Sequence, residues 1–193
     1  MAGEYEYDVF FSYKRLDLSL EWTRQVSKVL KHWLTEELGG HHARVFIDEE
    51  CIETGEKWPE KLKLALQRSK CMVCVWSPSY FQSGWCVSEW KSFLEREKMA
   101  RMKSHGLIAP LKFHDGEHFP EEARCVQWVD VSAYAVTMPA FWRSVRAIDL
   151  EKKLKSFARS VAKIAKVAPP YRSDWPVVES KGASPPKIGL AKL

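Results

Sequence analysis

One uninterrupted apolar run, from Cys71 to Trp76, constrains the fold more than any other feature of this sequence. A strand that is buried on one face alternates apolar and polar residues, whereas a run without alternation is typical of a strand that is buried on both faces. Strands of that kind belong to parallel sheets that helices cover on each side. The run, which Ser77-Pro78 ends, therefore predicts an α/β protein with this segment at the centre of its sheet.

The segments around this run alternate between strand-like and helix-like patterns. The other expected strands are Tyr7–Ser12, Ala43–Asp48, Leu107–Phe113 and Val126–Val131, and the expected helices are Leu18–Leu38, Pro59–Ser69, Gly84–Lys103 and Pro139–Lys166. Five strands that alternate with helices predict a doubly wound, five-stranded parallel sheet with helices on both faces. Ligands bind such sheets at the carboxyl ends of the strands. The loops after Ser12, Asp48 and Ser77 are therefore the first candidates for a site.

The chain has 193 residues, 46% of them apolar, which suits one domain with a full core. After Lys166 the sequence becomes polar and contains several prolines, so we expect residues 1–166 to form the domain and residues 167–193 to form an extended tail or linker. Tyr171 and Trp175 are the exception within this tail, because two aromatic rings next to Pro169-Pro170 can dock on the domain. They would hold down the first part of the tail.

Charge and cysteine usage narrow the possible classes of function. No stretch of about 18 apolar residues is present, and the N-terminus lacks the pattern of a signal peptide, so we expect no membrane span and no export. The five cysteines have irregular spacing, which favours reduced thiols and a cytoplasmic location. Residues 1–140 carry 18 basic and 21 acidic side chains, whereas residues 141–166 carry eight basic and two acidic ones. One basic helix on a slightly acidic body argues against direct binding of nucleic acid.

Common cofactor and metal motifs are missing. The sequence contains neither of the glycine-rich loops that cradle phosphates. Cys71 and Cys74 form a C-x-x-C, but on a strand they face opposite sides and no second pair follows at zinc spacing. We therefore expect no metal site and no bound cofactor.

One constellation stands out, around Glu89 on the helix expected from Gly84. At helical spacing Glu89 shares a face with Trp85, Cys86 and Phe93. The apolar flank raises the pKa of such a carboxyl, while the nearby helix N-terminus lowers it. The ordinary structural interpretation is an exposed helix glutamate next to a core tryptophan, and these residues alone do not exclude it.

Four segments together resemble the Toll/interleukin-1 receptor (TIR) domain family. Tyr7 to Tyr13 is similar to its first signature, and Phe46 to Glu56 looks like the strand and the following BB loop of plant and bacterial members. Ser83 to Glu89 is similar to the W-C-x-x-E segment of enzymatic members, and Phe141-Trp142 matches the third signature. The resemblance covers residues 5–166 and implies a flavodoxin-like fold, in agreement with the doubly wound sheet expected above.

The resemblance also implies two alternative functions. Some TIR domains are adaptors that act only by self-association, whereas others cleave the nicotinamide–ribose bond of NAD+ with a glutamate at the position of Glu89. That glutamate favours an NAD+ glycohydrolase or cyclase in immune or anti-phage defence, with NAD+ as substrate and activation by self-assembly. Further expected partners are a downstream effector and a fused or associated sensor. The non-catalytic adaptor stays the alternative.

The resemblance assigns further residues to the substrate site. It places Ser12, Tyr13, Lys14 and Arg15 next to the ribose and diphosphate, with Arg15 as the natural anion partner. It adds Asp48 and Ile52 from the second strand and the BB loop, and Trp85 and Cys86 from the helix of Glu89.

Overall fold

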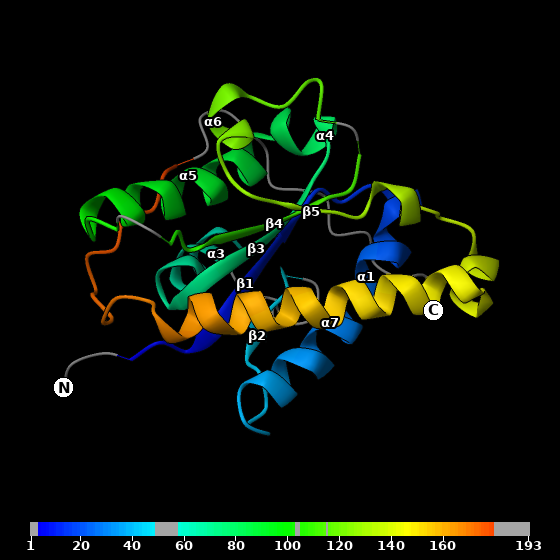
Figure 1. The fold of residues 1–193 in the computed structure, drawn as a ribbon. Coiled ribbons are helices and arrows are strands. Elements are labelled where there is room, and N and C mark those ends of the chain that lie inside the picture. Colours follow the sequence, from blue (N-terminus) through cyan, green and yellow to red (C-terminus); the bar gives the residue numbers. More distant parts are fainter. Residues whose placement is uncertain (1–3, 49–57, 103–104, 115, 180–193) are drawn as a thin grey trace.

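The structure is a computed structural model that describes residues 4–48, 58–102, 105–114 and 116–179 (Figure 1). These residues contain the strands β1 (Tyr7–Tyr13), β2 (Val45–Phe46), β3 (Ser69–Trp76), β4 (Ile108–Lys112) and β5 (Val129–Asp130). They form one sheet in the order β2-β1-β3-β4-β5, and every neighbouring pair is parallel. This is the strand order of the flavodoxin-like doubly wound fold, so the expected fold class is confirmed.

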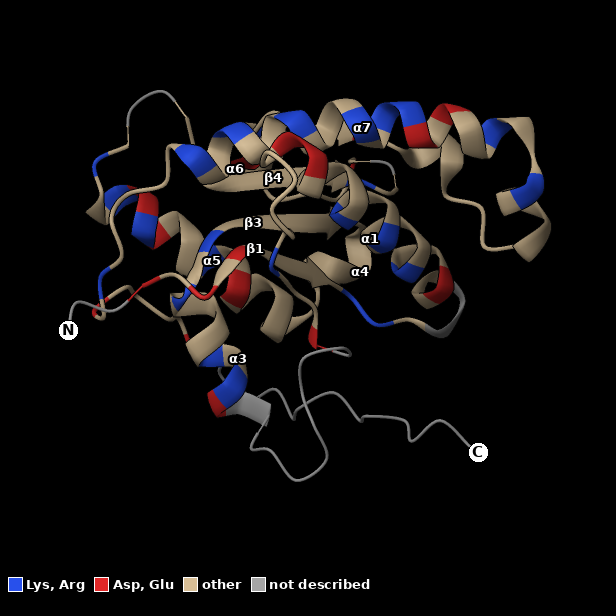
Figure 2. Ribbon diagram, turned by 90° about the horizontal axis from the view of Figure 1, so that it is seen from below, with Lys and Arg blue, Asp and Glu red and all other residues tan. Residues whose placement is uncertain are grey.

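Helices cover both faces of the sheet. They are α1 (Asp17–Glu37), α3 (Trp58–Gln67), α4 (Pro78–Phe81), α5 (Gly84–Met99), α6 (Glu121–Arg124) and α7 (Val145–Lys166), with 3-10 turns η1 (Ser132–Tyr134) and η2 (Pro139–Arg143). Helices α1 and α7 pack against each other on one face, and α3 and α5 lie on the other (Figure 1). Figure 2 shows the sheet between these layers and the basic residues repeating along α7.

The core confirms the central place of β3. Every residue from Cys71 to Trp76 is buried, as expected for a strand with a neighbour on each side and helices on both faces. Trp22 of α1 and Trp90 of α5 pack onto the two faces of the sheet, and both are almost fully buried. The carboxyl ends of β1 and β3 consequently lie next to each other, at the edge where the sequence predicts a site.

A buried carboxylate holds the opposite, amino-terminal end of the sheet. Asp8 accepts hydrogen bonds from Lys70 Nζ at 2.7 Å and from the Arg44 backbone N–H at 3.0 Å. Burial alone would raise the pKa of Asp8, but the bonds from Arg44 and Lys70 outweigh burial and lower it. Asp8 thereby ties β1 to the start of β3 and to the residue before β2.

Several element boundaries differ from those expected. Helix α5 ends at Met99 instead of Lys103, because Arg101 adopts a φ of 53°, which a right-handed helix cannot contain. The expected final helix is divided, since the extended backbone of Ser144 separates η2 from α7. The edge strands β2 and β5 each contain only two residues, and the short helices α4 and α6 were not expected.

The segment after α7 has no helix or strand among its described residues, 167–179. Trp175 nevertheless belongs to the largest fully buried side chains of the protein. The expected docking of this aromatic residue is therefore confirmed, while the domain division at residue 166 stays a prediction. No helix among the described residues is long and apolar enough to cross a membrane.

Candidate functional site

Ser12 and Glu89 meet at the carboxyl edge of the sheet. Ser12 is the sixth residue of β1, and its side chain points to the face covered by α5, since neighbouring strand residues alternate between faces. Glu89 lies in the second turn of α5 and is 7% exposed. Ser12 Oγ donates a hydrogen bond to Glu89 Oε2 at 2.6 Å. Two residues that the sequence placed in separate motifs therefore form one buried pair.

Tyr80 extends this pair, and the sequence did not single it out. Its hydroxyl lies 2.8 Å from Ser12 Oγ, and its side chain is fully buried. Since Ser12 donates its proton to Glu89, the Tyr80 hydroxyl donates to Ser12. Tyr80 follows β3 by four residues in the short helix α4, so the signal that could have found it is its place in a loop already marked as a candidate.

Burial dominates the electrostatics of Glu89. The pKa of Glu89 is raised from 4.5 to about 8, and desolvation by burial is the largest cause. The hydrogen bond from Ser12 lowers the pKa, the negative charge of Asp48 raises it, and the positive charge of Arg15 lowers it. Of the two opposing effects expected from the sequence, desolvation is the stronger. The carboxyl is therefore mostly protonated at neutral pH in the free protein.

Arg15, Asp48 and Tyr13 form a second polar group beside the first. Arg15 Nη2 makes an ion pair with Asp48 Oδ2 at 2.9 Å, and both side chains are 17% exposed. The Tyr13 hydroxyl donates to Asp48 Oδ1 at 3.0 Å. The side chain expected to act as the anion partner, Arg15, is thus already paired with Asp48 in the free protein.

The remaining expected site residues are placed differently. Cys86 is buried, its thiol donates to the Tyr13 carbonyl at 3.5 Å, and burial raises its pKa far above the usual range. This thiol is unsuited to act as a nucleophile. Lys14 lines a cavity of about 260 Å³ at the ends of β1, β3 and β4, together with Ser77, Ser79 and His114. Glu89 does not line this cavity. Ile52 lies outside the described residues.

A cavity of about 190 Å³ opens beside Glu89 between α3 and α5. Trp85 and Ser88 line it from α5, and Leu62, Lys63 and Leu66 line it from α3. Val177, Val178 and Glu179 complete the lining from the segment after α7, which the sequence did not connect with the site. The cavity therefore combines the buried carboxyl of Glu89 and the exposed carboxylate of Glu179, which is paired with Lys63, with apolar side chains.

This arrangement favours the stabilisation of a positive charge by a single carboxylate. Two further carboxylates lie in the neighbourhood, but the oxygens of Asp48 are held by Arg15 and Tyr13, and Glu179 is paired with Lys63. No group of three or more His, Cys, Asp or Glu residues in the described part of the chain is placed to hold a metal ion. The pKa of Glu89, about 8, lies near neutrality, a common property of catalytic carboxyls.

A match to the model of a known protein family identifies the family of this chain. The family model described as the TIR domain matches residues 9–159, which is most of the chain and includes most of β1, all of α5 and most of α7. The chain belongs to the TIR domain family. This membership confirms the resemblance drawn from the four sequence segments.

Relatives of this TIR domain come from a bacterium and from plants. It is 33% identical over 106 residues to the NAD(+) hydrolase TirS of Staphylococcus aureus, a match that covers 55% of this chain and 34% of that protein. It is 27% identical over 121 residues to the probable 2' cyclic ADP-D-ribose synthase BdTIR of Brachypodium distachyon, covering 60% and 50%. It is 29% identical over 108 residues to the disease resistance protein RUN1 of Vitis rotundifolia, covering 56% and 7%. The chain thus spans half or less of the length of these relatives.

Among solved structures, this TIR domain is similar to that of the Toll-related receptor TRR-2 from Hydra magnipapillata. The two are 20% identical, the match covers 76% of this chain and 98% of that one, and the TM-score is 0.47.

Proposed function

We propose that this TIR domain cleaves the nicotinamide–ribose bond of NAD+, with Glu89 as the catalytic residue. The observation that carries the proposal is the position of Glu89, which is buried at the carboxyl edge of the sheet, held by Ser12 and adjacent to a cavity that apolar side chains line in part. The names of two relatives, an NAD(+) hydrolase and a probable cyclic ADP-ribose synthase, support the same chemistry.

The reaction needs only one carboxylate because the leaving group is a neutral base. The bond between ribose C1' and the pyridinium nitrogen breaks, and its electron pair leaves with nicotinamide. A positive charge then develops on the ribose, and the ionised Glu89 carboxylate stabilises it electrostatically. Water next attacks C1' and loses a proton, which gives ADP-ribose; attack by a group of the same nucleotide gives a cyclic isomer instead.

The raised pKa of Glu89 fits this chemistry. In the free protein the carboxyl is mostly protonated at neutral pH, since burial raises its pKa to about 8. NAD+ carries a positive charge on its pyridinium ring, and a positive charge next to a carboxyl lowers its pKa. Binding of the substrate would therefore itself produce the ionised form that the reaction requires.

The size of the cavity supports activation by self-association. At about 190 Å³ it is smaller than the usual 300–1,000 Å³ of small-molecule sites, and it holds only part of a dinucleotide. The rest of the substrate then needs further surface, for which the segment 49–57 and a neighbouring copy of the chain are the candidates. The name of one relative, a disease resistance protein, supports a role in defence signalling.

The test incubates the protein with NAD+ at high protein concentration and with a crowding agent. Chromatography then measures the nicotinamide that is released. We expect Glu89→Gln to abolish release while the protein stays folded, since the change removes the charge and keeps the shape. Glu95→Gln is the matched control, because Glu95 lies on the same helix, exposed and paired with Lys98. Release at equal rates by wild type and Glu89→Gln would overturn the role of Glu89, and no release by either protein would favour the non-catalytic adaptor.

A further inference from the structure

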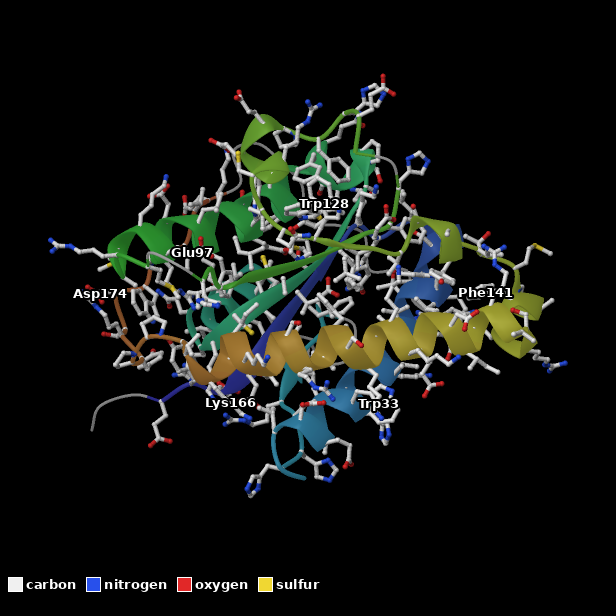
Figure 3. The ribbon with its side chains drawn as sticks, viewed as in Figure 1. Trp33, Glu97, Trp128, Phe141, Lys166 and Asp174 are labelled. Atoms are coloured by element: carbon white, nitrogen blue, oxygen red, sulfur yellow. The ribbon has the colours of Figure 1, made fainter. Side chains whose placement is uncertain are left out.

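The segment after α7 returns to the helix that carries Glu89. We call residues 168–179 the strap. Figure 1 shows the orange-to-red chain leaving the end of α7 and rising along α5. In Figure 3, Lys166 marks the end of α7, and Asp174 lies further along the strap, on the side of the molecule where α5 ends. The strap thus crosses from one face of the sheet to the other.

Trp175 anchors the strap to the domain. Its side chain is 2% exposed, and its indole N–H donates to the Tyr5 hydroxyl at 3.1 Å. Gln67 at the end of α3 donates to the Trp175 carbonyl at 3.1 Å. The Tyr5 hydroxyl in turn donates to the Pro169 carbonyl at 2.9 Å, so the anchor holds two points of the strap.

Arg96 connects this anchor to the helix of Glu89. It lies seven residues after Glu89 on α5 and is fully buried, with its guanidinium 5.3 Å from the centre of the Trp175 ring. Its Nη1 and Nη2 donate to the carbonyls of Ser69 and Leu66, each at 2.6 Å. Burial lowers the pKa of Arg96 to about 10, which leaves it charged at neutral pH. The strap therefore has a defined position relative to α5.

The end of the strap reaches the Glu89 cavity. The Val178 N–H donates to Ser92 Oγ at 2.9 Å, and Ser92 lies one turn after Glu89. Glu179 forms an ion pair with Lys63 Nζ of α3 at 2.6 Å, and both residues line the cavity between α3 and α5. Val177 and Val178 thereby line the cavity together with Trp85 and Glu89 and give it apolar surface from the strap.

We propose that Val177 and Val178 are specificity-determining residues that form the wall of the nicotinamide pocket. The inference rests on the proposed NAD+-cleaving function. Since Glu89 has to lie next to ribose C1', the ring bonded to C1' has to lie in the cavity beside Glu89. Most of the surface of this ring is apolar both in NAD+ and in the released nicotinamide, so an apolar wall stabilises the bound ring in both forms. The strap thus supplies a surface that the TIR fold up to Lys166 does not contain.

The test compares three isosteric substitutions in the full chain. Val177→Thr and Val178→Thr replace a methyl group in the cavity wall by a hydroxyl, and Val167→Thr makes the same change at an exposed position of the segment outside the strap. We expect the first two to raise the KM for NAD+ about three- to tenfold, with an unchanged melting temperature, and the third to leave KM unchanged.

Product inhibition then shows which part of the substrate the two valines contact. The two wall variants should raise the inhibition constant of nicotinamide by the same factor and leave that of ADP-ribose unchanged. A second outcome is that wild type cleaves NAD+ while both wall variants keep its KM or raise only the inhibition constant of ADP-ribose. In that case the assignment of Val177 and Val178 to the nicotinamide pocket is wrong, and the proposed function stands. If wild type neither cleaves nor binds NAD+, the proposed function and the wall are both overturned.

Discussion

Ser12 and Glu89 are 77 residues apart in the sequence, and Ser12 Oγ donates to Glu89 Oε2 at 2.6 Å. The hydroxyl is itself held by Tyr80, so the carboxyl faces a donor whose direction is set by a second buried side chain. A fixed donor favours the ionised form of a buried carboxyl, against the desolvation that disfavours it. The charge on Glu89 is consequently sensitive to each of its few neighbours.

The pH dependence of turnover should report this balance. If the ionised carboxylate is the active form, kcat/KM rises with pH and levels off above about 8, because kcat/KM follows the pKa of the free protein. The kcat profile should rise at lower pH, since the pyridinium charge of bound NAD+ lowers the pKa of Glu89. Initial rates between pH 5 and 10 measure both profiles. A kcat/KM that is flat from pH 6 to 9 would contradict the assignment.

Ser12→Ala removes the donor to Glu89 and should move the kcat/KM profile to higher pH. The hydrogen bond from Ser12 lowers the pKa of Glu89, so its loss raises that pKa further above 8. Tyr80→Phe should cause a smaller shift in the same direction, because it acts through Ser12. Ser27→Ala is the control, since Ser27 is also buried and its hydroxyl donates to a carbonyl within α1. An unchanged profile midpoint in Ser12→Ala would show that the bond does not control ionisation.

Asp48→Asn should move the same profile in the opposite direction. Its negative charge raises the pKa of Glu89 and its carboxylate engages Arg15, whose positive charge lowers that pKa. The substitution removes the first effect and frees the second, so the midpoint moves to lower pH. Titration of activity in the two variants provides the comparison. A shift of both midpoints in the same direction would rule out this electrostatic account.

Glu89→Gln should stabilise the fold increasingly as the pH rises. In the unfolded chain Glu89 ionises near 4.5, and in the folded protein near 8, so the folded state binds more protons between these values. Wild type therefore loses stability as the pH rises from about 4.5 to about 8, whereas the glutamine variant lacks this loss, on the order of a few kcal/mol. Thermal melting of both proteins from pH 4 to 9 measures it. A difference in melting temperature that does not grow with pH would contradict the raised pKa.

Local patterns of the chain predicted the elements well, because each pattern reflects an environment that neighbouring residues share. The unbroken run to Trp76 required a strand covered on both sides, and β3 is that strand. Patterns failed where a boundary depends on one backbone angle, as at Arg101, or on a single extended residue, as at Ser144. The docking of Trp175 was expected from its chemistry alone, but its partners Tyr5 and Arg96 were not.

The sequence by itself determined the alternation of strands and helices, the edge of the sheet where a site can form, and Glu89 as its candidate residue. Only the tertiary structure decided that Tyr80 holds Ser12, that Asp48 neutralises Arg15, and that the strap lines the cavity of Glu89. The physical reason is that periodicity records whether a residue is buried, whereas hydrogen bonds and pKa values depend on which distant side chains share that burial. Strand order and helix packing determine which distant side chains become neighbours, and no local stretch of the chain encodes these contacts.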